Sequence, residues 1–201
     1  MNKYEIFWGG TDVNPALYNQ IKHKTTQKPD EERDKKEKTL FNLCIINKTP
    51  MIGICRGAQF LNVMNGGTLI QDIHGHTRGH TVITDDNEQF YVTSTHHQMM
   101  VPTKEAKILA IDKRKVLCLD SPTGNTYSPK EGIEVVYYPK TLSLCIQFHP
   151  EFMHPGSQAV LWVHKKVKEL FNINNLQLRD YITEYNSKFR RNKINEILFI
   201  P

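Results

Sequence analysis

A cysteine stands where two different sequence patterns meet. The apolar run Met51–Ile54 before it is typical of a buried strand, and the residues after it show apolar side chains at helical spacing until Gly66–Gly67. Glycines stand two positions before and two positions after Cys55, where side chains would collide in a sharp strand-to-helix turn. The pattern predicts a nucleophile elbow that carries a thiol, with the helix N-terminus favouring the thiolate.

The same turn would place a hydrogen-bond donor beside the nucleophile. The N–H of Arg56, the first helical residue, would face the oxygen of a carbonyl group attacked by the thiolate. A simpler interpretation is that Cys55 is a small buried residue that ends a strand. The short pattern Gly-x-Cys-x-Gly does not by itself decide between the two.

A histidine and a glutamate follow a second strongly apolar segment. The run 142–148 predicts a core strand, and His149 and Glu151 come directly after it on either side of Pro150. A histidine at a strand end can deprotonate a thiol, and a carboxylate can orient the imidazole and stabilise its charged form. A lone histidine after a core strand is more often structural, so the motif needs a partner elsewhere in the chain.

Taken together, these motifs resemble the class I glutamine amidotransferases. Residues 53–59, Gly-Ile-Cys-Arg-Gly-Ala-Gln, are similar to the nucleophile motif of that superfamily, and residues 148–151, Phe-His-Pro-Glu, to its other signature. Residues 62–73 narrow the resemblance to the γ-glutamyl-γ-aminobutyrate hydrolase-like branch, peptidase C26. The resemblance implies a catalytic triad of Cys55, His149 and Glu151.

A glycine pair near the start of the chain belongs to a third motif. Residues 4–8 predict a short strand, and the following Gly9–Gly10 would alone indicate a tight turn. Residues 9–18 are similar to the family segment Gly-Gly-x-Asp-Val-x-Pro, which lies beside the nucleophile. The resemblance therefore implies that the N–H of Gly10 completes the oxyanion hole with that of Arg56.

The resemblance also implies which residues contact the substrate. Residues 94–98, Ser-Thr-His-His-Gln, look like the pocket segment Ser-x-His-His-Gln of the hydrolase branch, and the position of Gln59 contacts the glutamyl end in relatives. The implied substrate-binding residues are Gln59, His96, His97 and Gln98. The alternative for the second segment is a surface loop with histidines that stand together by chance.

Three further histidines, His74, His76 and His80, stand close together after the elbow helix. Catalytic zinc needs three well-oriented protein ligands, whereas glycines interrupt this stretch. The resemblance implies metal-independent chemistry. We therefore expect a polar loop near the site, with no metal ligands and no cofactor.

A helix is predicted from Asp30, its capping residue, to about Asn47. Its apolar face would consist of Leu40, Leu43 and Cys44. A charged run covers the rest of the helix and includes Arg33, Asp34 and Glu37. These three residues resemble an Arg-Asp-x-x-Glu segment of relatives, but a solvated face with i,i+4 pairs explains them equally well.

Composition limits the class of protein. With 201 residues, 39% of them hydrophobic and 23% charged, the chain is expected to form a globular domain. No apolar run is long enough for a membrane span, and the four cysteines show neither disulfide nor zinc spacing, so we expect reduced thiols and a cytoplasmic protein. The net charge is +5, but the lysines are scattered and no nucleic-acid motif accompanies them.

The resemblance implies an α/β fold of three layers, flavodoxin-like, with a mainly parallel central sheet. We expect this domain over residues 1–171, with an antiparallel excursion through residues 81–140 and a helix from Gly156 to Phe171. Relatives usually carry two further β-α units before the glycine pair, so the sheet is expected to be smaller. Residues 172–201 would form a helical extension, with its helix over 176–190, that covers the same chain or a second copy.

Three functions are compatible with these motifs. The first is a hydrolase that cleaves a γ-glutamyl amide through a glutamyl thioester. The second is a glutaminase subunit that supplies ammonia to a separate synthetase, and the third is a catalytically silent binding homologue. The expected partners are a small γ-glutamyl substrate and either a twin subunit or a synthetase, with no nucleic acid and no membrane.

Overall fold

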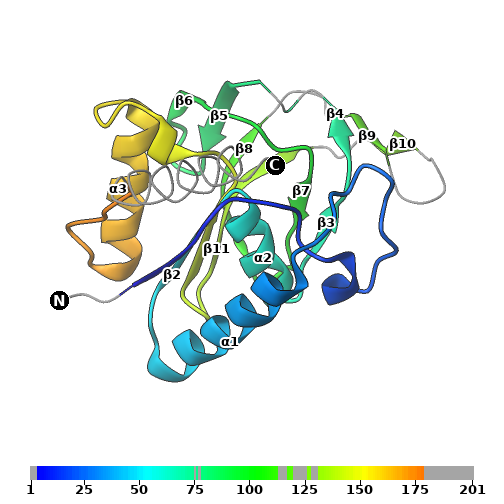
Figure 1. The fold of residues 1–201 in the computed structure, drawn as a ribbon. Coiled ribbons are helices and arrows are strands. Elements are labelled where there is room, and N and C mark those ends of the chain that lie inside the picture. The colour runs from blue at the N-terminus through cyan, green and yellow to red at the C-terminus, as the bar shows by residue number, and fades with distance from the viewer. Residues whose placement is uncertain are drawn as a thin grey trace, which may run out of the picture. The chain divides into compact units, whose positions relative to one another are not determined.

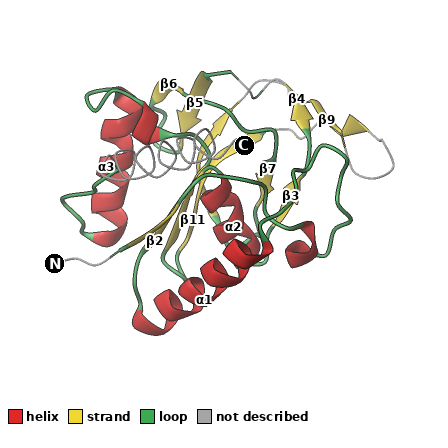
Figure 2. Ribbon diagram, in the orientation of Figure 1, coloured by secondary structure: helices red, strands yellow, loops and turns green. Residues whose placement is uncertain are grey.

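The computed structural model of the chain describes residues 4–74, 76, 78–112, 117–119, 126–127 and 131–178. The chain divides into two compact units, Met1–His149 and Pro150–Pro201. Figure 1 labels the elements, and Figure 2 distinguishes helices, strands and loops by colour.

The first unit is built on a seven-stranded sheet with the order β1-β2-β12-β11-β8-β5-β6. In that order the strands are Glu5–Phe7, Met51–Ile54, Ser143–Ile146, Gly132–Tyr138, Lys107–Asp112, His80–Thr84 and Gln89–Val92. Two small sheets pair β3 (Thr68–Ile70) with β7 (Met99–Val101), and β9 (Leu117–Leu119) with β10 (Thr126–Tyr127) and β4 (Ile73–His74). The helices are η1 (Pro15–Tyr18), α1 (Glu31–Asn47) and α2 (Arg56–Met64).

The large sheet is mixed. β1, β2 and β12 are parallel neighbours, and every pair from β12 through β11, β8 and β5 to β6 is antiparallel. The α/β class and the predicted antiparallel excursion are therefore confirmed. The parallel part contains fewer strands than expected, because no crossover helix lies between β5 and β12 in the described residues, and parallel strands need such a connection.

The parallel strands are held in register around β2. Phe7 of β1 and Cys145 of β12 both lie opposite Gly53, so the three strands end at the same edge of the sheet. All four residues of β2 are buried, which explains why its sequence is continuously apolar instead of alternating. Helix α2 follows directly and packs against this part of the sheet, where Phe60 stacks on Phe7 with ring centroids 5.9 Å apart.

The turn from β2 to α2 is as sharp as predicted. Cys55 has φ 52° and ψ −111°, a backbone conformation that a non-glycine residue rarely adopts. A Cβ atom on Gly53 would lie 2.6 Å from the carbonyl oxygen of Gly57, and one on Gly57 would overlap the carbonyl group of Phe7. Both glycines are therefore required by close backbone approach.

Helix α1 begins where predicted, with the Asp30 carboxylate accepting a hydrogen bond from the N–H of Arg33 at 3.0 Å. Its buried face differs from the prediction. Cys44 is buried, but Leu43 is 50% exposed, and Phe41 and Asp34 are buried. The charged run is thus not simply a solvated face, because one of its carboxylates turns inward.

The inward carboxylate meets the side chain of Arg56, which fastens α1 to α2. The guanidinium of Arg56 is buried and pairs with Asp34 and Glu37, and its Nε donates to the carbonyl oxygen of Thr11 at 3.2 Å. Burial lowers the pKa of Arg56 to about 10, with Arg33 adding to the effect and Asp34 opposing it. Burial also raises the pKa of Asp34, against the lowering effect of Arg56.

The second unit contains η2 (Pro150–Phe152) and α3 (Gln158–Phe171), which Ser157 caps. The predicted helix at Gly156–Phe171 is confirmed with a start two residues later. Residues 172–178 form neither helix nor strand, although Ile173, Leu176 and Leu178 are buried. The rest of the predicted helical extension lies outside the described residues, so its packing stays a prediction.

Adding a methyl group at Gly57 should destabilise the protein because the Cβ would overlap the Phe7 carbonyl. We expect Gly57→Ala to lower the free energy of unfolding by about 1–3 kcal/mol. Chemical denaturation followed by circular dichroism would measure it. Gly156→Ala is the matched control, since its Cβ would approach the His154 ring no closer than 3.4 Å. Equal stability of the two variants would contradict this explanation of the turn.

Removing a carboxylate of α1 that pairs with the buried Arg56 should destabilise the protein far more than removing a carboxylate on the exposed face of α1. We expect Asp34→Asn to lower the free energy of unfolding by about 3 kcal/mol, because the Arg56 charge loses a buried partner. Glu32→Gln breaks the exposed pair with Lys36 and should leave the free energy of unfolding nearly unchanged. Denaturant titrations that gave similar values for both variants would disprove a structural role for the pairing of Asp34 with Arg56.

Candidate active site

The three parallel strands each end at a residue with potential chemistry. Gly9–Gly10 follow β1, Cys55 follows β2, and His149 stands three residues after β12. A Cβ atom built on Gly9 would lie 3.0 Å from Cε1 of His149 and 3.7 Å from Cβ of Cys55. The imidazole and the thiol-bearing residue therefore both lie against the backbone of Gly9, and a side chain on Gly9 would crowd the His149 ring.

His149 is positioned through its backbone by Thr93. The Thr93 hydroxyl donates to the carbonyl oxygen of His149 at 3.2 Å and accepts from its N–H at 3.3 Å. Cys55 is 9% exposed and His149 is 8% exposed, so both are nearly sealed from solvent. The sequence did not single out Thr93, because its contact joins residues far apart in the chain. Glu151 is buried in η2 and belongs to the second unit.

The other described cysteines lie in different surroundings. Cys44 and Cys145 are buried and form no disulfide, and burial raises the pKa of Cys145 far above its usual range. The side chain of Cys118 lies outside the described residues. Of the three described cysteines, Cys55 has the largest exposed fraction and stands at a helix N-terminus.

The orientation of the N–H groups of Arg56 and Gly10 follows from the contacts of the carbonyl oxygens in the same peptide units. The carbonyl oxygen of Cys55 accepts from the N–H of Gln59 at 3.1 Å, so the N–H of Arg56, in the same peptide unit, points out of the helix end. Arg33 donates to the carbonyl oxygens of Trp8 at 2.7 Å and Gly9 at 3.1 Å. Since a trans peptide directs its C=O and N–H oppositely, the N–H of Gly10 points away from Arg33.

The residues predicted to bind substrate fall into two environments. Gln59 and Gln98 are buried, and the side-chain amide of Gln59 donates to the Gln98 carbonyl oxygen at 3.3 Å and to Oε1 of Gln147 at 3.4 Å. His97 is 26% exposed at its side chain and is the most accessible of the predicted set.

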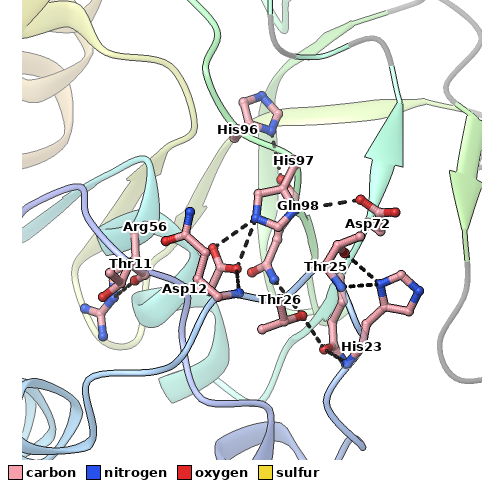
Figure 3. A network of polar contacts seen from close by, with 12 residues as sticks. Thr11, Asp12, His23, Thr25, Thr26, Arg56, Asp72, His96, His97 and Gln98 are labelled. Carbon is pink, nitrogen blue, oxygen red and sulfur yellow. Dashed lines mark hydrogen bonds and ion pairs between the residues drawn. The ribbon is translucent and has the colours of Figure 1, made fainter.

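His97 lies between two carboxylates (Figure 3). Its Nε2 is 3.0 Å from Oδ2 of Asp12, and its Nδ1 is 3.7 Å from Oδ1 of Asp72. The hydrogen bond with Asp12 raises the pKa of His97 and outweighs burial, and the charge of Asp72 adds to the increase. An imidazolium at this position has a carboxylate facing each of its ring nitrogens, so its charge is neutralised locally.

Residues 23–27, in the loop before α1, are held by hydrogen bonds to the side chains of Gln71 and Asp12. Oε1 of Gln71 accepts from the N–H of His23 and from the hydroxyl of Thr26, both at 2.9 Å. Asp12 accepts from the N–H of Gln27 at 2.8 Å. Figure 3 shows Asp12, His23 and Thr26 in this network. No sequence pattern indicated this arrangement, because a polar loop is expected to be exposed.

His96 turns away from His97 into a buried cluster with His76, His80, Asp112 and Glu134. Burial by itself would raise the pKa of Glu134, but the three histidines that face it hold this pKa well below its usual range. The cluster contains two combinations that could hold a metal ion, namely His76, His80 and Asp112, and His76, His96 and Glu134. His74 stays 60% exposed at its side chain and outside the cluster.

Comparison with curated proteins gives matches that each cover part of the chain. A Mycobacterium tuberculosis protein, named provisionally as a glutamine amidotransferase, is 45% identical over 78 residues, or 37% of this chain and 25% of that protein. The arginine-specific small chain of carbamoyl phosphate synthase from Bacillus subtilis is 28% identical over 121 residues, or 59% of this chain and 31% of that protein. The matched part thus spans about a quarter to a third of these relatives.

The fold and the family agree with these relatives. The crystal structure of a glutamine amidotransferase from Thermotoga maritima covers 86% of this chain with a TM-score of 0.50 at 14% identity, and 86% of that chain is matched, which shows a common fold. Among the described residues, no helix has the length and apolar character needed to cross a membrane. The Peptidase C26 family matches residues 5–151, and because this is well over half of the chain, the protein belongs to the Peptidase C26 family.

Proposed function

We propose that the protein is a cysteine-dependent hydrolase that cleaves γ-glutamyl amides through a glutamyl thioester. The observation that carries this proposal is the meeting of Cys55, His149 and the Gly9–Gly10 turn at the ends of three adjacent parallel strands. Membership of the Peptidase C26 family and the similarity to glutamine amidotransferases support the reaction class.

In the proposed reaction, Sγ of Cys55 attacks the carbonyl carbon of the γ-glutamyl amide. The N–H groups of Gly10 and Arg56 stabilise the oxyanion that forms. His149 takes the thiol proton and gives it to the departing amine, which leaves a glutamyl thioester on Cys55. His149 then deprotonates a water molecule that hydrolyses the thioester, and Glu151 holds the imidazole in the required orientation.

Two arginines support the proposed oxyanion hole without touching the substrate. Arg33 fixes the carbonyl oxygens of Trp8 and Gly9 and so directs the N–H of Gly10. Arg56 has its guanidinium buried against Asp34 and Glu37, which fixes the first turn of α2 and therefore its own N–H. Preorganised donors stabilise a transition state because they do not need to reorient during the reaction.

For substrate binding, we retain Gln59, His96, His97 and Gln98 as the proposed residues and give them different roles. His97 is the member that can contact the substrate directly, because it is partly exposed. Gln59, Gln98 and His96 are buried, so they would shape the pocket from behind.

A second candidate is a glutaminase subunit that supplies ammonia to a separate synthetase. The similarity to the small chain of a carbamoyl phosphate synthase favours it. The same triad would then hydrolyse glutamine, and docking of the synthetase would control the rate. The two candidate functions differ in whether the chain hydrolyses its substrate without a second protein.

The test is amine release from a panel of γ-glutamyl amides, glutamine included, by the purified chain alone. We expect turnover of some members of the panel, with Cys55→Ala and His149→Ala each lowering kcat/KM by about 10³-fold or more and Glu151→Gln lowering it less. Cys44→Ala is the matched control, because this buried cysteine lies in the hydrophobic core, and it should keep the activity.

Two results would redirect this proposal. Glutamine hydrolysis that appears only after a second protein is added would establish the glutaminase subunit. Wild-type rates in Cys55→Ala, with circular dichroism showing a folded protein, would exclude the thioester mechanism for both candidates.

The raised pKa of His97 gives stability a pH dependence with a definite sign. Because the pKa in the folded state lies above the usual 6.5, His97 stabilises the fold fully below about pH 6.5, and this stabilisation is lost as the pH rises through the folded-state pKa. The stability difference between wild type and His97→Gln should therefore shrink as the pH rises from about 5.5 to about 9.

His164 supplies a control of opposite sign, since burial lowers its pKa. Its neutral form is favoured in the folded state, so it weakens the fold at low pH and this effect disappears as the pH rises towards about 6.5. Urea titrations of wild type, His97→Gln and His164→Gln at several pH values would measure the two trends. A constant difference for His97→Gln would show that Asp12 and Asp72 do not hold an imidazolium.

A further inference from the structure

Five ionisable side chains meet inside the first unit. His80, Asp112 and Glu134 come from strands β5, β8 and β11, and His76 and His96 come from two loops. Each is at most 4% exposed. A buried group of two carboxylates and three imidazoles has a large desolvation cost unless its charges are balanced and its polar atoms are paired.

One atom of each histidine points at the same carboxylate oxygen. Nε2 of His80 lies 2.9 Å from Oε1 of Glu134, and Nδ1 of His76 and Nε2 of His96 each lie 3.6 Å from it. Zinc ligands at about 2.0–2.1 Å in tetrahedral geometry are about 3.3 Å apart. The two separations of 3.6 Å are close to this value, whereas the 2.9 Å separation is that of a hydrogen bond from His80 to Glu134.

Three of the atoms at this centre have no hydrogen-bond partner in the described structure. They are Nδ1 of His76, Nε2 of His96 and Oε2 of Glu134. Buried polar atoms are nearly always hydrogen-bonded in folded proteins, so three such atoms in one place require an explanation.

In each of the three histidines, the ring nitrogen that faces away from Glu134 lies near an oxygen atom that can accept its proton in a hydrogen bond. Nδ1 of His96 lies 2.8 Å from the carbonyl oxygen of Gln98, which can only accept, so Nδ1 carries the proton and Nε2 directs a lone pair at Glu134. Nδ1 of His80 similarly faces the carbonyl oxygen of Arg78 at 3.4 Å. Nε2 of His76 faces Oδ2 of Asp112 at 3.6 Å. Carbonyl and carboxylate acceptors behind the ring are typical of metal-bound histidines.

We propose that His76, His96 and Glu134 bind one divalent cation of the zinc class, with His80 positioning Glu134 and Asp112 positioning His76 from behind. Two imidazole nitrogens and one carboxylate oxygen are ligands that zinc prefers. The cation would lie between the unpaired atoms of these three residues and separate the lone pair of His96 from the carboxylate. It would also offset the charges of the two buried carboxylates.

The position of this site gives it a structural role. It joins the loop that carries His76 and the loop that carries His96 to the central sheet. The two loops are also joined directly, because the hydroxyl of Ser94 donates a hydrogen bond to the carbonyl oxygen of His76. The carbonyl oxygen of Gln98 accepts from both His96 and Gln59. The cation would thereby fix the segment that also carries His97, without taking part in the reaction.

The test uses the full chain with Cys55→Ala, so that the reactive thiol does not compete for the metal. After treatment with a chelator, zinc titration against a chromophoric competitor should give one tight equivalent per chain. Cobalt should give the visible bands of a tetrahedral site with no thiolate charge-transfer band. Zinc at about 100 times its dissociation constant should raise the melting temperature by about 5–10 °C.

Zinc binding by variants of the proposed ligands, compared with a variant of a nearby exposed histidine, would locate the site. Glu134→Gln and His96→Gln should lose the tight equivalent, and Asp112→Asn should weaken it by about 10–100-fold. His74→Gln is the matched control, because His74 is exposed in the same stretch and outside the cluster, and it should bind zinc as before.

Absence of a tight equivalent in the folded Cys55→Ala chain, with no cobalt bands, would overturn the proposal in favour of an ion-free cluster with protonated histidines. Loss of binding in His74→Gln as complete as in Glu134→Gln would also overturn it. Should Glu134→Gln fail to fold by circular dichroism, the cobalt spectrum and Asp112→Asn still decide.

Discussion

The parallel register of β1, β2 and β12 is the constraint on which the site depends. Each strand ends at the same edge of the sheet and leads into one part of the site, namely the glycine turn, the cysteine or the histidine. A slip of β12 by one residue would exchange the faces of its side chains and move His149 away from Gly9.

A second constraint lies beneath the first turn of α2. Cys55 adopts a strained backbone conformation, and such strain persists only where surrounding contacts hold it. The buried guanidinium of Arg56 supplies those contacts through Asp34, Glu37 and the Thr11 carbonyl. Helix α1 thus acts on both proposed oxyanion donors, since its Arg33 directs the Gly10 peptide and its carboxylates hold Arg56.

The parts predicted best from the sequence were those determined by local pattern. The elbow at Cys55, the cap at Asp30 and the strand before His149 follow from spacing and residue type within a few positions, and all three elements are confirmed. The misplaced residues on α1 have another cause. Hydrophobic periodicity favoured Leu43 for the core, but the need to pair the buried Arg56 turned Asp34 inward instead. A buried ion pair between distant residues leaves no periodic signal.

The histidines show more clearly that contacts between distant residues cannot be predicted from sequence spacing. The sequence grouped His74, His76 and His80 by proximity, and grouped His96 with His97, whereas the structure gathers His76, His80 and His96 around Glu134. His96 and His97 are neighbours in the chain, yet one faces the buried cluster and the other faces Asp12 and Asp72. Any change in the cluster therefore reaches the proposed pocket through a single peptide unit. Because a side chain at the pocket must be held in place from behind, a rigid buried centre next to His97 is a physical advantage, and it explains why so polar a cluster is kept beside an apolar sheet.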